Sequence, residues 1–416
     1  MCAEKMRALQ TEGKSTKLVG RSFDLTAAYR QLAISDRSSR WSRVAVFNPH
    51  TKRTECFRMF CLPFGARASV NAFIRTARML QFLALQIGIV VSCYFDDFIV
   101  LSVPALSEAT KKAFAALLDL VGFAYDKTGP KADAMSHEVS ALGVVFDLTS
   151  SEAGFLRVRN TDKRVEEVTA KIHETLDGKF LTPSAAATLK GRLGFAEGQL
   201  FGRSARRLIN ELGSFATSVR RRSEITEDLT VSLNAVERML LSGKPREIDS
   251  KSHEVMFLYT DASYSPEDES GGIGGVLCAA DGTVLAWFGE ELSSAVCSRF
   301  KTEGQTQLIG ELKALAVLVA LKTWSKEISS KHLVAFIDNE GSKFSILKGY
   351  SKNPCLSEIV TAIACAEESA SCFVWYARVP SECNPADGPS RGQPCRAAPE
   401  NSRVRVEVCQ LEAFTA

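Results

Sequence analysis

Two adjacent acids, Asp96 and Asp97, lie between two apolar runs of the chain. Val90 and Val91 precede them, and residues 98–101, which follow, read Phe-Ile-Val-Leu. Short β-branched runs on both sides of a polar break predict two strands joined by a tight turn. Two like charges at the tip of such a hairpin repel each other, and a divalent cation between them relieves that repulsion. The pair therefore predicts an antiparallel hairpin with a candidate metal site at its tip.

A third acid distinguishes this interpretation from a simpler one. An isolated Asp-Asp pair is usually a solvated turn, because Asp is a common turn residue. Asp24, however, ends another short apolar run, within the sequence Ser-Phe-Asp-Leu-Thr-Ala-Ala-Tyr at residues 22–29. Three acids on strand ends are the arrangement that a two-metal phosphoryl-transfer site requires. The first half of the chain is therefore predicted to hold such a site.

Four short segments of this half resemble the palm of a reverse transcriptase. Asp24 matches the first metal-binding Asp of that family, and residues 94–97 match its Tyr-x-Asp-Asp box. Residues 62–65, Leu-Pro-Phe-Gly, resemble the segment that lines the nucleotide and template pocket in retrotransposon enzymes. Lys131, followed by Leu-Gly at 142–143, has the spacing of the family's Lys-to-Leu-Gly segment. Among retrotransposon enzymes, these segments most resemble those of the DIRS-like group.

The resemblance covers about residues 20–215 and implies an RNA-directed DNA polymerase. It implies that Asp24, Asp96 and Asp97 are catalytic and hold two Mg²⁺ ions, with Mn²⁺ as the alternative metal, since both prefer carboxylate oxygen. The implied substrates are an RNA template, a DNA primer and deoxynucleoside triphosphates.

Four further residues are expected to bind substrate in this family: Tyr29, Phe64, Gly65 and Lys131. Tyr29 matches the bulky position that excludes a ribose 2′-hydroxyl, and an ordinary half-buried aromatic is the alternative. Lys131 would assist the triphosphate or protonate pyrophosphate, and a surface lysine is equally expected.

The second half carries an independent set of strand-like runs. Asp261 follows an apolar run at 255–259, and Asp338 follows another at 333–337. Two more runs, at 273–279 and 283–288, are joined by Asp-Gly, the strongest short hairpin signal. These four runs predict a sheet with two acids at strand ends.

Two more acids are predicted at helix starts. Glu311 lies in the first turn of a long predicted helix, and Asp387 opens a final helix after the strand-like run at 372–376. The buried side of the long helix is marked by four aliphatic residues: Leu312, Leu315, Val319 and Leu321. Strand ends and helix starts converge on one edge of a mixed sheet, where open α/β sheets place their sites.

The order of these acids resembles the Asp-Glu-Asp-Asp set of ribonuclease H, and the order of elements matches that fold. Any one of the acids alone is more often a cap or a surface charge. Together, Asp261, Glu311, Asp338 and Asp387 are implied to be catalytic and to hold two Mg²⁺ ions that activate water against the RNA of an RNA–DNA hybrid. Cellular ribonucleases H carry a histidine in the loop that corresponds to residues 379–384. Ser and Glu occupy that region here, so reduced activity is expected.

A length of 416 residues allows two to three domains. The fold class expected is α/β: an α+β polymerase palm and helical thumb, followed by a ribonuclease H-like mixed-sheet α/β domain. The expected bounds are a palm at 1–150, a thumb or connection at 151–242, a linker at 243–252, the ribonuclease H-like domain at 253–392 and a tail at 393–416 without assigned function. Residues 1–21 are too few to build the fingers of a polymerase, so a truncated N-terminus is expected.

A net charge of +3 produces no global basic field, so contacts to phosphate are expected from local groups. These groups are Lys190, Arg192, Arg203, Arg206, Arg207 and the arginine run at 220–222. A solvated helical face is the alternative for any one of them.

The 12 cysteines include no Cys-x-x-Cys pair and no zinc spacing, which predicts reduced thiols in an intracellular protein of the cytoplasm or nucleus. No leader precedes the first motif, so secretion is not expected. The longest apolar stretch, at 79–95, is too short and too polar to span a bilayer.

Three functional hypotheses stay open at this point. The first is a retrotransposon segment with both polymerase and ribonuclease H activity. The second is a truncated element with ribonuclease H activity only, and the third is a non-catalytic remnant that binds nucleic acid. The sequence leaves the oligomeric state open.

Overall fold

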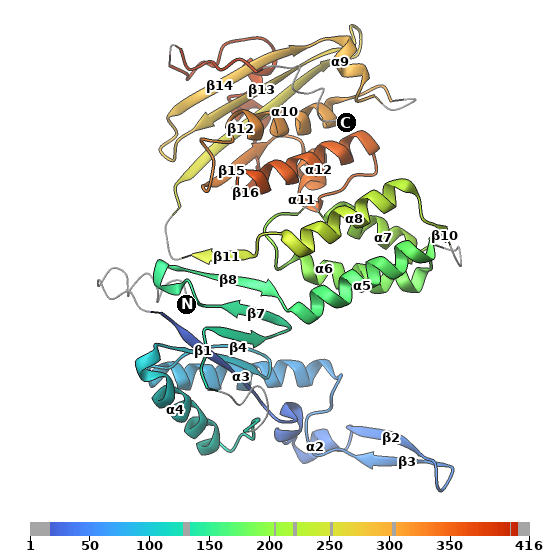
Figure 1. Ribbon diagram of the computed structural model, residues 1–416, viewed down its shortest axis with the longest axis vertical. Coiled ribbons are helices and arrows are strands. Elements are labelled where there is room, and N and C mark those ends of the chain that lie inside the picture. Colours follow the sequence, from blue (N-terminus) through green and yellow to red (C-terminus); the bar gives the residue numbers. More distant parts are fainter. Residues whose placement is uncertain are drawn as a thin grey trace. The chain divides into compact units, whose positions relative to one another are not determined.

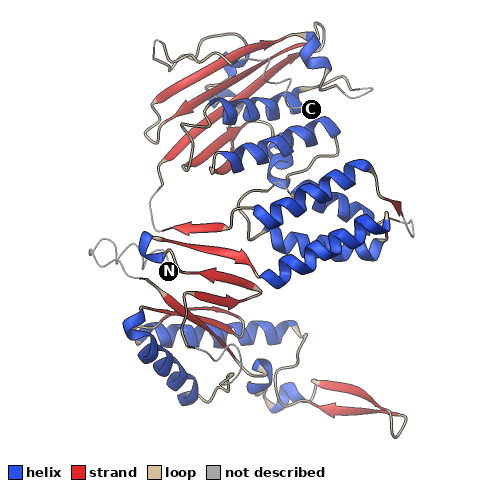
Figure 2. Cartoon of the chain, viewed as in Figure 1, coloured by secondary structure: helices blue, strands red, loops and turns tan. Residues whose placement is uncertain are grey.

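The chain divides into two compact units of mixed helices and strands, Met1–Asp162 with Pro245–Lys251 and Lys163–Lys244 with Ser252–Ala416. Each unit holds both helices and strands (Figures 1 and 2), so the predicted α/β fold class is confirmed. In this computed structural model the described residues are 17–127, 134–203, 205–218, 223–249, 253–301, 305–399 and 401–406. Among them, no helix is both long enough and apolar enough to cross a membrane.

The core of the first unit is a three-stranded antiparallel sheet. Its middle strand β5 (Asp97–Ser102) pairs with β1 (Val19–Asp24) on one side and with β4 (Val90–Tyr94) on the other. The helices α3 (Arg67–Gln86) and α4 (Ser107–Leu120) contribute buried side chains to the core of this sheet. The strand–turn–strand predicted around the paired acids is confirmed.

Two aromatic residues show how this core is packed. The Phe23 ring of β1 meets the Phe114 ring of α4 edge-on, with centroids 4.8 Å apart. Both side chains are fully buried, so they contribute apolar burial as well as a favourable ring geometry.

A separate hairpin, β2 (Arg43–Asn48) with β3 (Arg53–Arg58), projects from the rest of this unit (Figure 1). None of its residues is buried, and Phe47 and Phe57 are among its exposed aromatics. It is preceded by two short helices, η1 (Ala28–Gln31) and α2 (Asp36–Ser39).

A second sheet of this unit has the strand order β11-β8-β7-β6. Its strands are β6 (Glu138–Ala141), β7 (Val144–Asp147), β8 (Phe155–Asn160) and β11 (Arg246–Asp249). Strand β11 lies inside the segment 243–252 that was expected to be a linker, and β8 lies beyond residue 150. No local pattern predicted this sheet, because β11 and β8 are far apart in the sequence. They pair along their backbones and through an ion pair between Arg157 and Glu247 at 2.9 Å.

Four helices begin the second unit: α5 (Asp162–Gly178), α6 (Pro183–Glu197), α7 (Arg206–Ala216) and α8 (Glu227–Ser242). The start of α6 is capped, because the Thr182 hydroxyl accepts a hydrogen bond from the Ala185 N–H at 3.2 Å and Pro183 is the first helical residue. A small antiparallel pair, β9 (Phe180–Leu181) with β10 (Ser223–Glu224), lies beside them. Leucines from α6, α7 and α8 share one core.

The rest of this unit is a five-stranded mixed sheet with the order β14-β13-β12-β15-β16. Its strands are β12 (Val255–Ser265), β13 (Ser270–Cys278), β14 (Val284–Leu292), β15 (His332–Ile337) and β16 (Phe373–Arg378). The first three are antiparallel, and β15 and β16 run parallel to β12. This is the order of elements expected of a ribonuclease H-like domain.

Helices α10 (Ile309–Thr323) and α12 (Pro354–Ser369) pack on this sheet, with α9 (Ser294–Ser298) and α11 (Glu340–Lys348) at its margins. One buried side was predicted for α10, but every residue from Glu311 to Leu321 is buried. The helix is enclosed because both the sheet and α12 pack against it.

The short helix α13 (Asp387–Ser390) lies directly on the backbone of β13 and β14. A Cβ atom added to Gly274 would lie 2.6 Å from the Ser390 nitrogen, and one added to Gly289 would lie 2.5 Å from the Pro389 carbonyl oxygen. Glycine at these positions therefore lets α13 approach the sheet closely.

The chain beyond α13 returns along the outer edge of β14. The Trp287 N–H donates to the Ser402 carbonyl at 3.0 Å, and the Val404 N–H donates to the Trp287 carbonyl at 2.8 Å. The Arg403 guanidinium also donates to the Gly289 carbonyl at 2.9 Å. Part of the tail, which the sequence left without an assigned function, thus forms a parallel bridge to β14 between Arg403 and Trp287.

Candidate active sites

The palm acids meet because two strands pair in register. Asp24 at the end of β1 lies directly opposite Asp97 at the start of β5. Phe95, in the turn just before Asp96 and Asp97, has a left-handed φ of 52°, and the Leu25 N–H donates to the Asp96 carbonyl at 3.3 Å. The turn is thereby tied to β1, and Asp24, Asp96 and Asp97 share one end of the sheet, where all three are half-buried.

A fourth acid, which the sequence analysis missed, lies beside this end of the sheet. The Asp126 N–H donates to the Asp24 carbonyl at 3.0 Å, and the Thr26 hydroxyl donates to the Asp126 carboxylate at 3.2 Å. Asp126 is exposed, and no motif of the sequence marks it.

The predicted nucleotide pocket has only part of its residues in the described structure. The Tyr29 ring stacks on the buried Phe73 ring, with centroids 4.8 Å apart, and meets Phe64 edge-on at 5.6 Å. Phe64 is 89% exposed, and Gly65 has a φ of 88° with open space around it. Phe73 therefore holds one face of the Tyr29 ring. This is compatible both with a residue that excludes a ribose 2′-hydroxyl and with an ordinary half-buried aromatic. Lys131 lies outside the described residues.

The acids of the second unit are placed by two neighbouring parallel strands. Thr260 of β12 is in register with Ile337 of β15. Asp261 and Asp338 follow these two residues, so they emerge at the same end of the sheet. Asp338 comes directly after β15, while Asp261 is still within β12.

A lysine from α10 reaches both of these acids. The Lys313 ammonium lies 2.8 Å from the Asp261 Oδ1 atom and also donates to the Asp338 Oδ1 atom. The side chains of Lys313, Asp261 and Asp338 are only 11%, 3% and 7% exposed. Lys313 was not predicted as a site residue, although it is the one charged residue between Glu311 and Lys322 in an apolar helix.

Two further groups orient the acids. The Ser381 hydroxyl donates to the Asp338 Oδ2 atom at 3.1 Å, and the Ala262 N–H donates to the Asp261 Oδ1 atom at 2.8 Å. Burial raises the pKa of the Asp261 carboxyl above its ordinary value, and the Lys313 ammonium opposes that rise while the charge of Asp338 adds to it.

The other two predicted acids have different partners. Glu311 Oε1 accepts hydrogen bonds from Gln305 at 2.9 Å and Asn353 at 2.8 Å. Asp387 Oδ1 accepts two bonds from the Arg391 guanidinium, at 3.1 and 3.0 Å. Of the four acids, the structure joins Asp261 and Asp338 through one cation and gives Glu311 and Asp387 separate partners.

Carboxylate oxygens are the ligands that Mg²⁺ and Mn²⁺ prefer, so the donor set can be tested against a metal. Asp261 and Asp338 converge on a single positive charge, the Lys313 ammonium, and this pair fits a divalent cation. Within the described ranges, no group of three or more His, Cys, Asp or Glu side chains is arranged to hold a metal ion. Glu311 and Asp387 would have to leave their present partners to complete a shared metal site.

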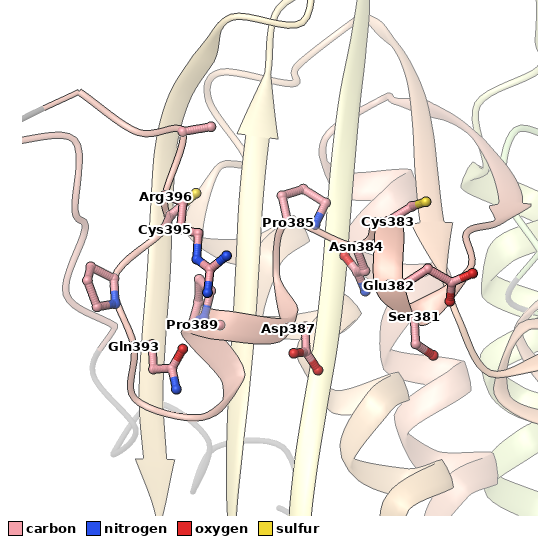
Figure 3. Close-up of a pocket in the computed structure, with 13 residues that line it drawn as sticks. Ser381, Glu382, Cys383, Asn384, Pro385, Asp387, Pro389, Gln393, Cys395 and Arg396 are labelled. Carbon is pink, nitrogen blue, oxygen red and sulfur yellow. The ribbon is translucent and has the colours of Figure 1, made fainter.

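A pocket of about 350 Å³ lies beside Asp387. Figure 3 shows Ser381, Glu382 and Cys383 on one side of Asp387, and Gln393 and Arg396 on the other. The pocket therefore adjoins the Asp338 side of the site, since Ser381 bonds to Asp338.

The basic residues predicted to contact phosphate are mostly ion-paired. Arg203 pairs with Glu367 at 2.7 Å, Arg206 with Glu197 at 2.7 Å, and Arg207 with Glu211 at 3.0 Å. Arg192 lies 3.8 Å from Glu167, and the arginine run at 220–222 lies outside the described residues. These pairs give Arg203, Arg206 and Arg207 structural roles that the sequence did not predict.

No family model and no curated protein matches the sequence. Among solved structures, the foamy viral protease-reverse transcriptase in complex with double-stranded DNA is 16% identical, covering 88% of this chain and 59% of that one at a TM-score of 0.45. The N-terminal ribonuclease H domain of a Mycobacterium tuberculosis protein, solved as a maltose-binding-protein fusion, is 14% identical over 33% of this chain and 92% of that one. Its TM-score is 0.28. RNase H1 of Halobacterium salinarum is 15% identical over 33% of this chain and 95% of that one, also at a TM-score of 0.28.

This chain thus spans 59% of the length of the foamy viral protein. The fold of this chain is defined by its own strand order and register.

Proposed function

We propose that the chain is a nucleic-acid-processing enzyme of the retrotransposon type, with a polymerase site in its first unit and a ribonuclease H site in its second. The observation that carries the proposal is the register of paired strands. In one sheet it sets Asp24 opposite Asp97, and in the other it brings Asp261 and Asp338 to one end. Clustered acids on strand ends suit two-metal phosphoryl transfer.

In the polymerase site, Asp24, Asp96 and Asp97 would hold Mg²⁺, which supplies a Lewis acid for the primer hydroxyl and neutralises charge on the leaving pyrophosphate. The protein's own contribution is to fix the acids. The bond from the Leu25 N–H to the Asp96 carbonyl holds the turn, and the cross-strand pairing holds Asp24 beside Asp97. Tyr29, stacked on Phe73, would exclude a ribose 2′-hydroxyl.

In the ribonuclease H site, Asp261 and Asp338 would hold the first metal, and Glu311 and Asp387 would complete the site after leaving Asn353 and Arg391. The Ser381 hydroxyl donates to the Asp338 Oδ2 atom, so Oδ1 is the oxygen that faces the cation position. The burial of Asp261 excludes water from one side of that position and strengthens its electrostatic interactions.

The substrates of the proposal follow from these two activities. They are an RNA template, a DNA primer and deoxynucleoside triphosphates for the first unit, and an RNA–DNA hybrid for the second. The proposal keeps the domain bounds predicted from the sequence, with β8 and β11 assigned to the palm. It also includes the DIRS-like origin.

The deciding experiment measures cleavage of a hybrid labelled on its RNA strand by the full chain in Mg²⁺. Asp338→Asn should lower the rate roughly a thousandfold, because a unit charge about 4 Å from a cation contributes on the order of 4 kcal/mol at an effective dielectric near 20. Asp281→Asn is the matched control, since Asp281 lies in the β13–β14 turn and bonds the Thr283 N–H. Cleavage by Asp338→Asn at the parent rate, or cleavage that persists in EDTA, would contradict the ribonuclease H proposal.

A further inference from the structure

Lys313 is a buried cation on an otherwise apolar stretch of α10. Its side chain is 11% exposed, and residues 314–321 of the helix are all apolar and buried. Removing an ammonium group from water is costly unless opposite charges and hydrogen bonds compensate it. Lys313 therefore depends on the acids that it contacts.

Those acids are the two that fit a metal. The ammonium bonds Asp261 Oδ1 at 2.8 Å and Asp338 Oδ1, so the same two oxygens that would bind a divalent cation already share one positive charge. Two carboxylates and one ammonium have a formal charge of −1, since −2 and +1 sum to −1. The cluster still attracts a cation, but the gap between its acids is filled.

A divalent cation cannot share this gap with the ammonium. Mg²⁺ binds carboxylate oxygens at about 2.0–2.1 Å, so it would lie between the same two atoms that the ammonium now contacts. Two cations at such a separation would also repel each other strongly in a buried site. Binding of the metal and the present position of Lys313 are therefore mutually exclusive.

We propose that Lys313 is an intrinsic competitor that a divalent cation must displace from Asp261 and Asp338, and that it thereby sets the metal concentration at which the site fills. The inference deepens the proposed function and rests on its metal site. Displacement does not require α10 to move, because a lysine has a flexible four-carbon stem.

This competition has two expected consequences. Removing the ammonium should lower the metal concentration at half-saturation at least about tenfold, since the metal no longer has to break two charge-assisted hydrogen bonds. It should also lower the melting temperature in the absence of metal, because Asp261 and Asp338 would then face each other unneutralised. Added metal should raise the melting temperature of such a variant more than that of the parent.

The test measures Mn²⁺ binding by electron paramagnetic resonance of the free ion, together with melting temperature in a Ca²⁺ titration. The protein is the full chain, with Asp24→Asn, Asp96→Asn and Asp97→Asn in every sample so that the acids of the first unit do not contribute. Lys313→Met is compared with Lys322→Met, which removes the same charge from the last turn of the same helix. Mn²⁺ binding that is lost in Asp338→Asn is assigned to the cluster of Asp261, Asp338 and Lys313.

Tighter Mn²⁺ binding in Lys313→Met alone, with a larger Ca²⁺-induced rise in melting temperature, supports the inference. Equal or weaker binding than in the parent overturns it while leaving the proposed function intact. Absence of any Mn²⁺ binding sensitive to Asp338→Asn, in parent and variant alike, overturns both. Lys313→Gln, which removes the charge but keeps a polar hydrogen-bond donor, replaces Lys313→Met if that variant does not fold, and the same outcomes apply.

Discussion

The two candidate sites bring acids together in different ways. In the first unit, Asp24 and Asp97 are cross-strand neighbours at a half-buried end of the sheet. In the second unit, the side chains of Asp261 and Asp338 are only 3% and 7% exposed and share the ammonium of Lys313. Two acids that are largely removed from water need a cation close by, because little solvent is left to screen their repulsion. In the second site the protein itself supplies that cation, so a metal ion would have to take the place of a positive charge that is already there.

The largest expected effect separates the two sites by activity. Asp96→Asn should reduce primer extension roughly a thousandfold, because it removes a unit charge from the metal position, and should leave hybrid cleavage unchanged. Asp338→Asn should show the reverse pattern. Both activities are measured on the same purified protein, and an equal loss of both in either variant would show that the sites are not independent.

The next prediction concerns the stability of the second unit. Arg203, just after α6, donates two bonds to the buried carboxylate of Glu367 in α12, at 2.7 and 2.8 Å, and the Tyr376 hydroxyl donates to the same carboxylate at 2.5 Å. Arg203→Met should cost about 3 kcal/mol of unfolding free energy, because it leaves a buried charge without its partner. Denaturant titration measures this cost, and Arg192→Met, at a longer and more exposed pair, is the control.

A third prediction tests how α13 is seated on the sheet. Gly274→Ala would bring a Cβ atom within 2.6 Å of the Ser390 nitrogen and 2.7 Å of the Ala386 carbonyl oxygen. The helix must then shift, at a cost of about 1–3 kcal/mol, and Asp387 shifts with it. Hybrid cleavage should fall, while Mn²⁺ binding at Asp261 and Asp338 is retained. A variant that cleaves like the parent would show that Asp387 is not needed at its present place.

A fourth prediction concerns sugar selection at the palm. Tyr29→Ala should raise the incorporation of ribonucleotides relative to deoxyribonucleotides by about tenfold, the scale at which steric exclusion of one small group usually acts. Tyr29→Phe, which keeps the ring on Phe73, should leave the ratio unchanged. If both variants keep the parent ratio, Tyr29 is a packing residue only.

The smallest effect is a dependence of stability on alkaline pH. Burial, followed by the charge of Glu367, raises the pKa of Tyr376 well above its ordinary value. The unfolded chain therefore releases this proton at lower pH than the folded one, so the stabilisation is complete below about pH 10 and declines above it. Melting temperatures between pH 9 and 11 should fall less steeply in Tyr376→Phe than in the parent. Parallel slopes would show that this hydroxyl does not contribute.

Local sequence signals predicted much of the architecture. Alternation and turn residues were enough for the hairpin at Asp96 and Asp97 and for the β13–β14 turn, because strands and turns have short-range signatures. The start of α6 has an equally local signature, a capping Thr followed by Pro. The strand-like runs of the second half predicted strands of the five-stranded sheet, but their order across that sheet is seen only in the structure.

The contacts that matter most for the sites had no such signature. Lys313 bonds acids that lie 52 and 25 residues away in the sequence, so no local pattern marks the pairing. The sequence predicted a linker where strand β11 lies, because the partner strand β8 is remote in the sequence. The predicted convergence of all four acids on one metal position, with Glu311 and Asp387 included, stays a prediction.

The return of the tail along β14 has a consequence for how the protein behaves in solution. A strand at the margin of a sheet offers unpaired backbone groups to any other chain that can extend it. Residues 402–404 use part of that backbone at Trp287. A shortened ribonuclease H piece ending near residue 395 would uncover this margin, and it would tend to self-associate edge to edge even with every acid of its site in place.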